Sequence, residues 1–160
     1  MTSSTRHTSD HISLILEEED AMFTGDNVLG QGTAIFEDLS AYLISLHKMR
    51  GMFSGRAYPG HGPVIEDGKS RIVDYIQHRQ QREEQVIEVL SSSRSFGETK
   101  GAADWESMEI VKIIYKDIPD DLHLPAQGVV MQILQKLQDE DKVSLDPSTN
   151  KWRMKTRAAL

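Results

Sequence analysis

Cysteine is missing from the 160-residue sequence, so no disulfide can form and no thiolate is available as a metal ligand. No run approaches the roughly 18 apolar residues of a transmembrane helix, and the first residues lack the apolar stretch of a secretory signal. We therefore expect a cytoplasmic protein with no membrane partner. Any bound metal would need histidine and carboxylate ligands.

Basic charge is also scarce, because 18 Lys and Arg residues face 25 Asp and Glu residues, which leaves a net charge of −7. An acidic chain has no general attraction to phosphate backbones, so nucleic acid is not the expected partner. Hydrophobic residues at 38% and charged residues at 27% are typical of a folded, soluble protein.

The chain is predicted to have two folded parts. Residues 91–104, SSSRSFGETKGAAD, are rich in Ser, Gly and charge, which is typical of a linker. The prediction is therefore a first domain at 1–90, a linker at 91–104 and a small second domain at 105–160.

The first part predicts a mixed α/β fold. Its apolar runs alternate with glycine-rich loops and two longer amphipathic segments. The expected elements are a strand at His11–Leu16, a strand at Ala21–Thr24, a helix from a Thr33 cap to about Met49, a strand at Arg56–Tyr58 and a helix at Lys69–Leu90. The middle of the last helix is polar all round, which favours a helix bridging two packed bodies.

The second part predicts a winged helix. Two amphipathic segments are followed by two short apolar runs with a Pro-Ser-Thr-Asn turn between them. The expected elements are helices at Trp105–Tyr115 and Leu124–Asp139, then strands at Lys142–Leu145 and Lys151–Met154.

Three segments carry residues suited to metal chemistry: RHTSDH with His7, FTGDNVLGQGT with Asp26 and YPGHGP with His61. Imidazole and carboxylate groups bind Zn²⁺ or Mn²⁺, and sites collect on loops at strand ends. Other interpretations remain open. His7 could be a surface residue near the N-terminus, and Asp26 could simply form a turn. His61, between two glycines, is the hardest to explain by packing alone.

These motifs resemble those of the metallo-β-lactamase superfamily. His7 to His11 is similar to the end of its third motif, Gly25-Asp26 to the fourth and His61 to the fifth. The runs GDNVLGQGTAIFEDL, GRAYPGHGPVIEDG, YIQHRQQRE and IVKIIYKDIPDDLHLPA resemble the branch with a C-terminal winged helix, and especially its fungal lactamase-like members.

The resemblance implies the C-terminal half of an αββα sandwich followed by a winged helix. It also implies a site for two Zn²⁺ or Mn²⁺ ions, with His7, Asp26 and His61 as ligands. The implied activity is hydrolysis of a thioester that releases an aromatic polyketide from the acyl carrier protein of a non-reducing polyketide synthase. The alternatives are a single-stranded-RNA endonuclease, which the same branch includes, and a non-catalytic remnant or interaction module.

Two departures from the family pattern affect these expectations. The superfamily's main metal motif, Thr-His-x-His-x-Asp-His, does not occur, and Thr5-Arg6 stands where the family has Pro-Gly before His7. The resemblance therefore implies an N-terminally truncated chain that keeps only two protein ligands for each metal. We expect weak metal binding and impaired turnover from this chain alone.

Overall fold

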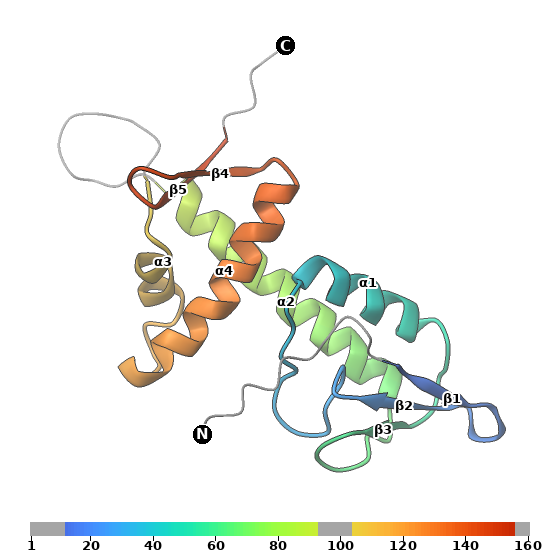
Figure 1. Cartoon of the computed structure of the whole chain (residues 1–160). Helices are drawn as coiled ribbons and strands as arrows, with labels where there is room; N and C mark the ends of the chain where they lie inside the picture. Colours follow the sequence, from blue (N-terminus) through green and yellow to red (C-terminus); the bar gives the residue numbers. More distant parts are fainter. Residues whose placement is uncertain (1–11, 93–103, 156–160) are drawn as a thin grey trace. The chain divides into compact units, whose positions relative to one another are not determined.

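The computed structural model describes residues 12–92 and 104–155, which form a mixed α/β fold as predicted (Figure 1). The chain divides into two compact units, Met1–Gln80 and Gln81–Leu160. This division falls inside the long helix α2 (Gly68–Ser91), so the second half of α2 belongs to the second unit. The predicted linker at 91–104 lies almost wholly outside the described residues and stays a prediction.

A three-stranded sheet organises the first unit. Its strands are β1 (Leu14–Leu16), β2 (Ala21–Gly25) and β3 (Ala57–Pro59), in the order β1-β2-β3. A short 3-10 turn, η1 (Glu17–Glu19), joins β1 to the antiparallel β2, whereas β2 and β3 are parallel. Because parallel strands run in the same direction, the carboxyl ends of β2 and β3 lie at the same edge of the sheet.

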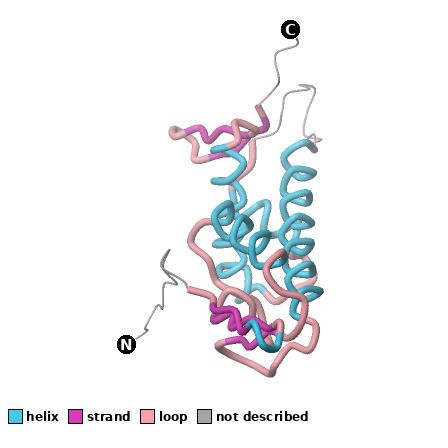
Figure 2. The backbone as a smooth tube through the Cα atoms, turned by 90° about the vertical axis from the view of Figure 1, so that its right-hand side faces the viewer, coloured by secondary structure: helices cyan, strands magenta, loops and turns pink. Residues whose placement is uncertain are grey.

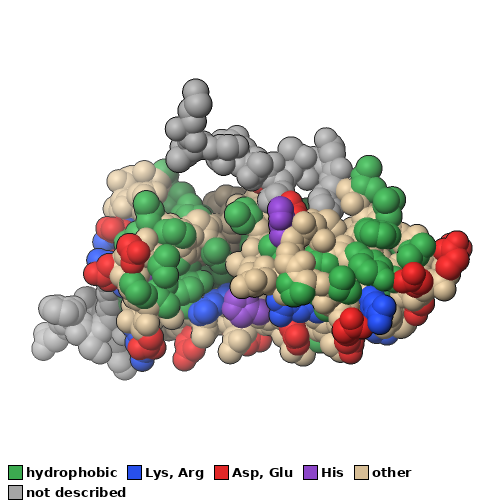
Figure 3. Space-filling view, turned by 90° about the horizontal axis from the view of Figure 1, so that it is seen from below, with side chains coloured by type: hydrophobic (Ala, Val, Ile, Leu, Met, Phe, Trp, Pro, Cys, Tyr) green, Lys and Arg blue, Asp and Glu red, His purple; other side chains and the backbone are tan. Residues whose placement is uncertain are grey.

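The two faces of this sheet differ in exposure. Met22 and its partner Ala57 are buried beneath the helices that cover one face (Figure 1). On the alternate face, Leu14, Phe23 and Tyr58 pair across the three strands, and Leu14 is 61% and Phe23 46% exposed. Tyr58 is half-buried, and its hydroxyl donates a hydrogen bond to Glu19. We call these three residues the exposed apolar row. Hydrophobic side chains are indeed visible at the molecular surface between charged groups (Figure 3).

Helix α1 (Leu39–Arg50) begins later than the sequence indicated. The carboxylate of Asp38 accepts a hydrogen bond from the Ala41 amide at 2.9 Å, so Asp38 is the cap and the prediction of Thr33 was wrong. The hydroxyl of Thr33 instead accepts a hydrogen bond from Arg79. Residues 33–38 are therefore held by side-chain contacts as a loop, and the helix starts where a capping carboxylate is available.

The second unit contains the predicted winged helix. Helices α3 (Ser107–Ile114) and α4 (His123–Asp139), with the short 3-10 helix η2 (Asp120–Leu122) between them, precede the hairpin of β4 (Val143–Asp146) and β5 (Lys151–Met154), whose strands are visible in Figure 2. Its core contains apolar side chains from both helices and the hairpin, among them Val111, Leu134, Leu137, Val143 and Trp152.

A network of charged side chains joins α2 to α4 within this second unit. The ammonium group of Lys136 lies 2.9 Å from a carboxylate oxygen of Glu83 and 2.7 Å from one of Glu140. Lys142 adds a second cation, 2.7 Å from Glu140. Burial lowers the pKa of Lys136, but its hydrogen bonds to Glu140 and Glu83 outweigh this and raise the pKa above its ordinary value. The Glu83 side chain is largely buried, and these cations balance its negative charge.

Replacing Lys136 with Met should destabilise the winged helix, because it leaves the largely buried Glu83 carboxylate without its nearest cation. We expect a loss of about 1–3 kcal/mol in the free energy of unfolding, less than for a fully isolated buried charge since Lys142 remains nearby. Urea denaturation measures this, and the exposed Lys112→Met on α3 is the matched control. Equal stability of both variants would contradict a structural role for the network.

Candidate metal centre

Asp26 and His61 meet at the carboxyl ends of the parallel strands. Asp26 directly follows β2 and His61 lies two residues beyond β3. The Nε2 atom of His61 is 3.6 Å from Oδ1 of Asp26, and the side chains are 78% and 26% exposed. The structure thus brings together two of the three residues singled out in the sequence. His7 lies outside the described residues.

Backbone contacts fix this pairing. The amide of Gly60 donates a hydrogen bond to the Gly25 carbonyl at 2.8 Å, which carries the β2–β3 pairing into the loop. A Cβ atom on Gly60 would lie 2.6 Å from Oδ1 of Asp26, so the carboxylate occupies the space that a side chain would need. Glycine at position 60 therefore lets the Asp26 carboxylate keep this position, which a larger residue would force it to leave.

The two loops also interlock beyond the strand ends. The amide of Gly30 donates to the His61 carbonyl at 3.0 Å. Gly62 has a φ of +87°, and a Cβ atom there would lie 2.6 Å from the Gln31 amide nitrogen. The glycines around His61 therefore allow the two loop backbones to pack closely, and Gly62 also allows the positive φ.

This pair fits part of a metal site. A carboxylate and an imidazole are ligand types that zinc accepts, and the empty Cβ position of Gly60 lets the carboxylate sit against the turn. Catalytic zinc usually has three protein ligands. In the ranges 12–92 and 104–155, no group of three or more His, Cys, Asp and Glu side chains could hold a metal. The ligand roles of His7, Asp26 and His61 therefore stay predictions.

Arg79 and Tyr75 hold the Asp26-bearing loop from α2, and the sequence analysis missed both. The Tyr75 hydroxyl donates to the Gly32 carbonyl at 3.0 Å and accepts a hydrogen bond from the Leu29 amide at 3.3 Å. Arg79 is only 5% exposed and donates to the Thr33 hydroxyl at 2.5 Å. The middle of α2 is polar in sequence, but it is not fully exposed, because Arg79 lies at helical spacing from Ile72 and Tyr75 and all three are buried.

A stacked aromatic pair, the half-buried Phe36 and the buried Tyr42, lies beside Arg79. Its guanidinium carbon is 4.9 Å from the centre of the Phe36 ring, which stacks on Tyr42 at 4.8 Å. Burial raises the pKa of the Tyr42 hydroxyl above its ordinary range, although the nearby Arg79 charge opposes this. The neutral hydroxyl donates to the Asn27 carbonyl at 2.7 Å and so fixes the loop that follows Asp26.

The described residues contain no helix that is long and apolar enough to cross a membrane.

Residues 107–152 match the family model of the β-lactamase associated winged helix domain. The lactamase-like protein aptB of Emericella nidulans is 36% identical over 154 residues, which cover 94% of this chain and 50% of that protein. The β-lactamase-like protein 2 homolog of Caenorhabditis elegans is 40% identical over 148 residues, covering 91% and 47%. The lactamase-like protein adaB of Aspergillus niger is 38% identical over 152 residues, covering 91% and 48%.

Two solved structures share the fold. A metallo-β-lactamase family protein from Thermus thermophilus superposes with a TM-score of 0.70 at 20% sequence identity, covering 93% of this chain and 46% of that one. A β-lactamase domain protein from Burkholderia ambifaria gives a TM-score of 0.74 at 18% identity, covering 91% and 44%. The fold is therefore half of a metallo-β-lactamase-type chain that includes a winged helix.

The chain belongs to the metallo-β-lactamase superfamily, among the lactamase-like proteins of the branch with a C-terminal winged helix, as the sequence motifs indicated. This is a family of hydrolase type. The chain spans about half the length of the curated relatives it matches.

Replacing Gly60 with Ala should weaken zinc binding, because the new methyl group must displace the Asp26 carboxylate. We expect affinity to fall about tenfold, the lower end of effects caused by groups that orient metal ligands. Titration with Zn²⁺, followed by NMR at the His61 imidazole, measures this. Gly128→Ala is the matched control, since nothing lies within 4 Å of its added Cβ. Equal affinity in both variants would show that the contact with Gly60 does not set the position from which Asp26 binds the metal.

Proposed function

We propose that this chain is the part of a metal-dependent thioesterase that supplies Asp26 and His61 to the metal site. The observation that carries the proposal is the 3.6 Å approach of their side chains at the carboxyl ends of β2 and β3, in a chain of this superfamily. Loops at such strand ends are where sites form on layered α/β folds.

In this proposal, residues of this chain hold the metal and orient the groups that bind it. Asp26 presents a carboxylate from a turn whose shape depends on Gly60, and His61 presents an imidazole from a loop locked by Gly62. The bound metal would supply a Lewis acid for the carbonyl oxygen and a water of lowered pKa as nucleophile. His7 is the third ligand in the proposal, and other parts of the full enzyme would provide the remaining ones.

The proposed substrate is an aromatic polyketide held as a thioester on an acyl carrier protein. Support comes from the fungal lactamase-like relatives at 36% and 38% identity and from the motif GDNVLGQGTAIFEDL, which resembles the fungal thioesterases of this branch. The carrier protein is the proposed partner. Zn²⁺ or Mn²⁺ is the proposed metal, and the cytoplasm the proposed compartment.

The charge arrangement of the winged helix argues against the RNA-cutting alternative. Arg153 lies 2.9 Å from a carboxylate oxygen of Asp104 and 3.6 Å from one of Asp146. Lys142 is paired with Glu140, and Lys155 with Asp141. Phosphate contacts dominate nucleic-acid affinity, and these cations already face carboxylates of their own chain.

The thioesterase proposal predicts that this chain binds Zn²⁺ weakly and lacks useful turnover, because the described residues offer two donors where catalytic zinc usually has three. Fusing it to the part of the Emericella nidulans relative that it does not match should restore both. In this fusion, His61→Ala should lower turnover of an acyl-carrier thioester by about 100-fold or more. The exposed His47→Ala on α1 is the matched control.

Calorimetry with Zn²⁺ and release of the free thiol are the two measurements. Full activity of the His61→Ala fusion would sink the proposed role of that residue. A fusion that binds zinc tightly but leaves every acyl thioester intact would contradict the proposed substrate class. It would still support the proposed metal site.

Binding of single-stranded RNA should be weak and nearly independent of sequence, with an affinity that changes little between about 50 and 200 mM salt. A true RNA-binding surface would lose affinity steeply over that range, because each phosphate contact releases counterions. Fluorescence anisotropy with a labelled oligonucleotide measures the slope. A steep slope that Lys151→Gln or Arg153→Gln reduces would favour the endonuclease alternative instead.

A further inference from the structure

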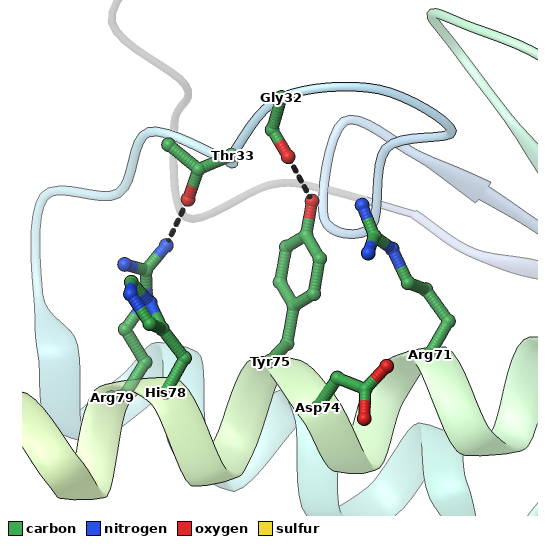
Figure 4. Close-up of a pocket in the computed structure, with 7 residues that line it drawn as sticks. All are labelled: Gly32, Thr33, Arg71, Asp74, Tyr75, His78 and Arg79. Atoms are coloured by element: carbon green, nitrogen blue, oxygen red, sulfur yellow. Dashed lines mark hydrogen bonds between the residues drawn. The ribbon is translucent and has the colours of Figure 1, made fainter.

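A pocket of about 290 Å³ lies between the first half of α2 and the loop that carries Gly32. Its lining residues are Gly32, Thr33, Arg71, Asp74, Tyr75, His78 and Arg79 (Figure 4). The volume is close to the lower limit for small-molecule sites. None of these residues is among the metal-ligand candidates, so this pocket is distinct from the Asp26–His61 pair.

The charges that line the pocket are mainly positive, although the chain as a whole carries −7. The lining includes two guanidinium groups, those of Arg71 and Arg79, and one carboxylate, that of Asp74. Arg71 and Tyr75 project from the helix toward the Gly32 loop, whereas the Asp74 carboxylate stays beside the helix (Figure 4). The two arginines and the one aspartate alone give the pocket one excess positive charge.

Arg71 is held in place without being neutralised. Its guanidinium carbon lies 5.1 Å from the centre of the Tyr75 ring, and that ring is itself fixed by the hydrogen bond from its hydroxyl to Gly32. Among the ion pairs of the described residues, Arg71 has no carboxylate partner. Its donors therefore remain available to a ligand, and the stacking limits the conformational entropy lost on binding.

Arg79 adds a buried cation to the same wall. Its side chain is bonded to the Thr33 hydroxyl and the Ala34 carbonyl, which are neutral groups, and its Nε atom has no hydrogen-bond partner. A buried charge is costly unless an opposite charge compensates it. Within the part of the chain that the structure describes, no carboxylate forms an ion pair with Arg79. An anion in the pocket would supply that charge.

We propose that this pocket binds the singly charged oxyanion group, a phosphodiester or a carboxylate, of a small organic molecule. Arg71 donates hydrogen bonds to the oxyanion, Arg79 adds its buried charge, and the Thr33 segment forms the opposite wall. A cationic ligand would meet two guanidinium groups, and an apolar one would leave Arg79 without an opposite charge. The inference does not rest on the proposed hydrolase function, because neither arginine is a candidate metal ligand.

The test titrates the ¹⁵N-labelled 160-residue chain with dimethyl phosphate and, separately, benzoate, at constant ionic strength set with chloride. Shifts should centre on the Gly32 and Thr33 amides and the Arg71 side chain. Arg71→Gln should weaken binding about tenfold, since a charge-assisted hydrogen bond is lost. Asp74→Asn should strengthen it about twofold to threefold, because an opposing charge is removed. Lys69→Gln, on the same helix but outside the pocket, is the matched control.

The relative affinities of the two probes identify the oxyanion as phosphodiester or carboxylate, and either preference supports the proposal. The proposal fails if neither probe shifts these signals at about 20 mM, an affinity too weak for a built site. It fails equally if Arg71→Gln and Lys69→Gln change binding alike, or if Asp74→Asn weakens it. Asp74 is exposed, so Asp74→Asn should leave the fold intact. Its expected gain in affinity therefore tests the proposal even if Arg71→Gln unfolds the chain.

Discussion

Parallel pairing of β2 with β3 is the constraint on which the candidate metal centre depends. Asp26 and His61 are 35 residues apart in the sequence, and each follows its strand by one or two residues. Only a parallel register brings both strand ends to the same edge of the sheet. Because the hydrogen bond from Gly60 to Gly25 extends that register, the carboxylate and the imidazole approach within 3.6 Å.

The parallel pairing requires a crossover, and the crossover residues build the surroundings of the site. Between β2 and β3 the chain forms the loop at 28–36 and helix α1, and this loop is then fastened by α2. Tyr75 bonds to the backbone of the loop at both Leu29 and Gly32, while Arg79 bonds to Thr33. The same contacts that hold the Asp26 loop thus also form the wall of the positively charged pocket.

Much of the fold follows from local sequence patterns. The winged helix was predicted because its two amphipathic helices and its strand-turn-strand segment each carry a strong local signal. The start of α1 was predicted wrongly, because the Thr33 hydroxyl has two potential partners and pairs with a distant arginine rather than with a helix amide. Only tertiary structure decides between a local cap and a contact 46 residues away.

The candidate site shows the same limit. The pairing of Asp26 with His61 could be expected from strand ends and glycine turns. The role of Arg79 could not be expected from the sequence. Its neighbours in YIQHRQQRE are polar and suggest an exposed helix. Its spacing from Ile72 and Tyr75 was the available signal, since all three lie on the buried face. A charged residue at an apolar position is easily assigned to solvent until its neighbours in space are known.

Two separate observations suggest that the metallo-β-lactamase-type unit is completed by further polypeptide. Asp26 and His61 give two donors, fewer than a catalytic zinc usually has. The exposed apolar row of Leu14, Phe23 and Tyr58 leaves one face of a short sheet in solvent, and contiguous exposed apolar surface usually marks an interaction site. The curated relatives are about twice as long as the matched segment. The proposed thioesterase accounts for both observations if an additional layer covers the sheet and brings further ligands to its edge, and these two effects should appear together in the fusion protein.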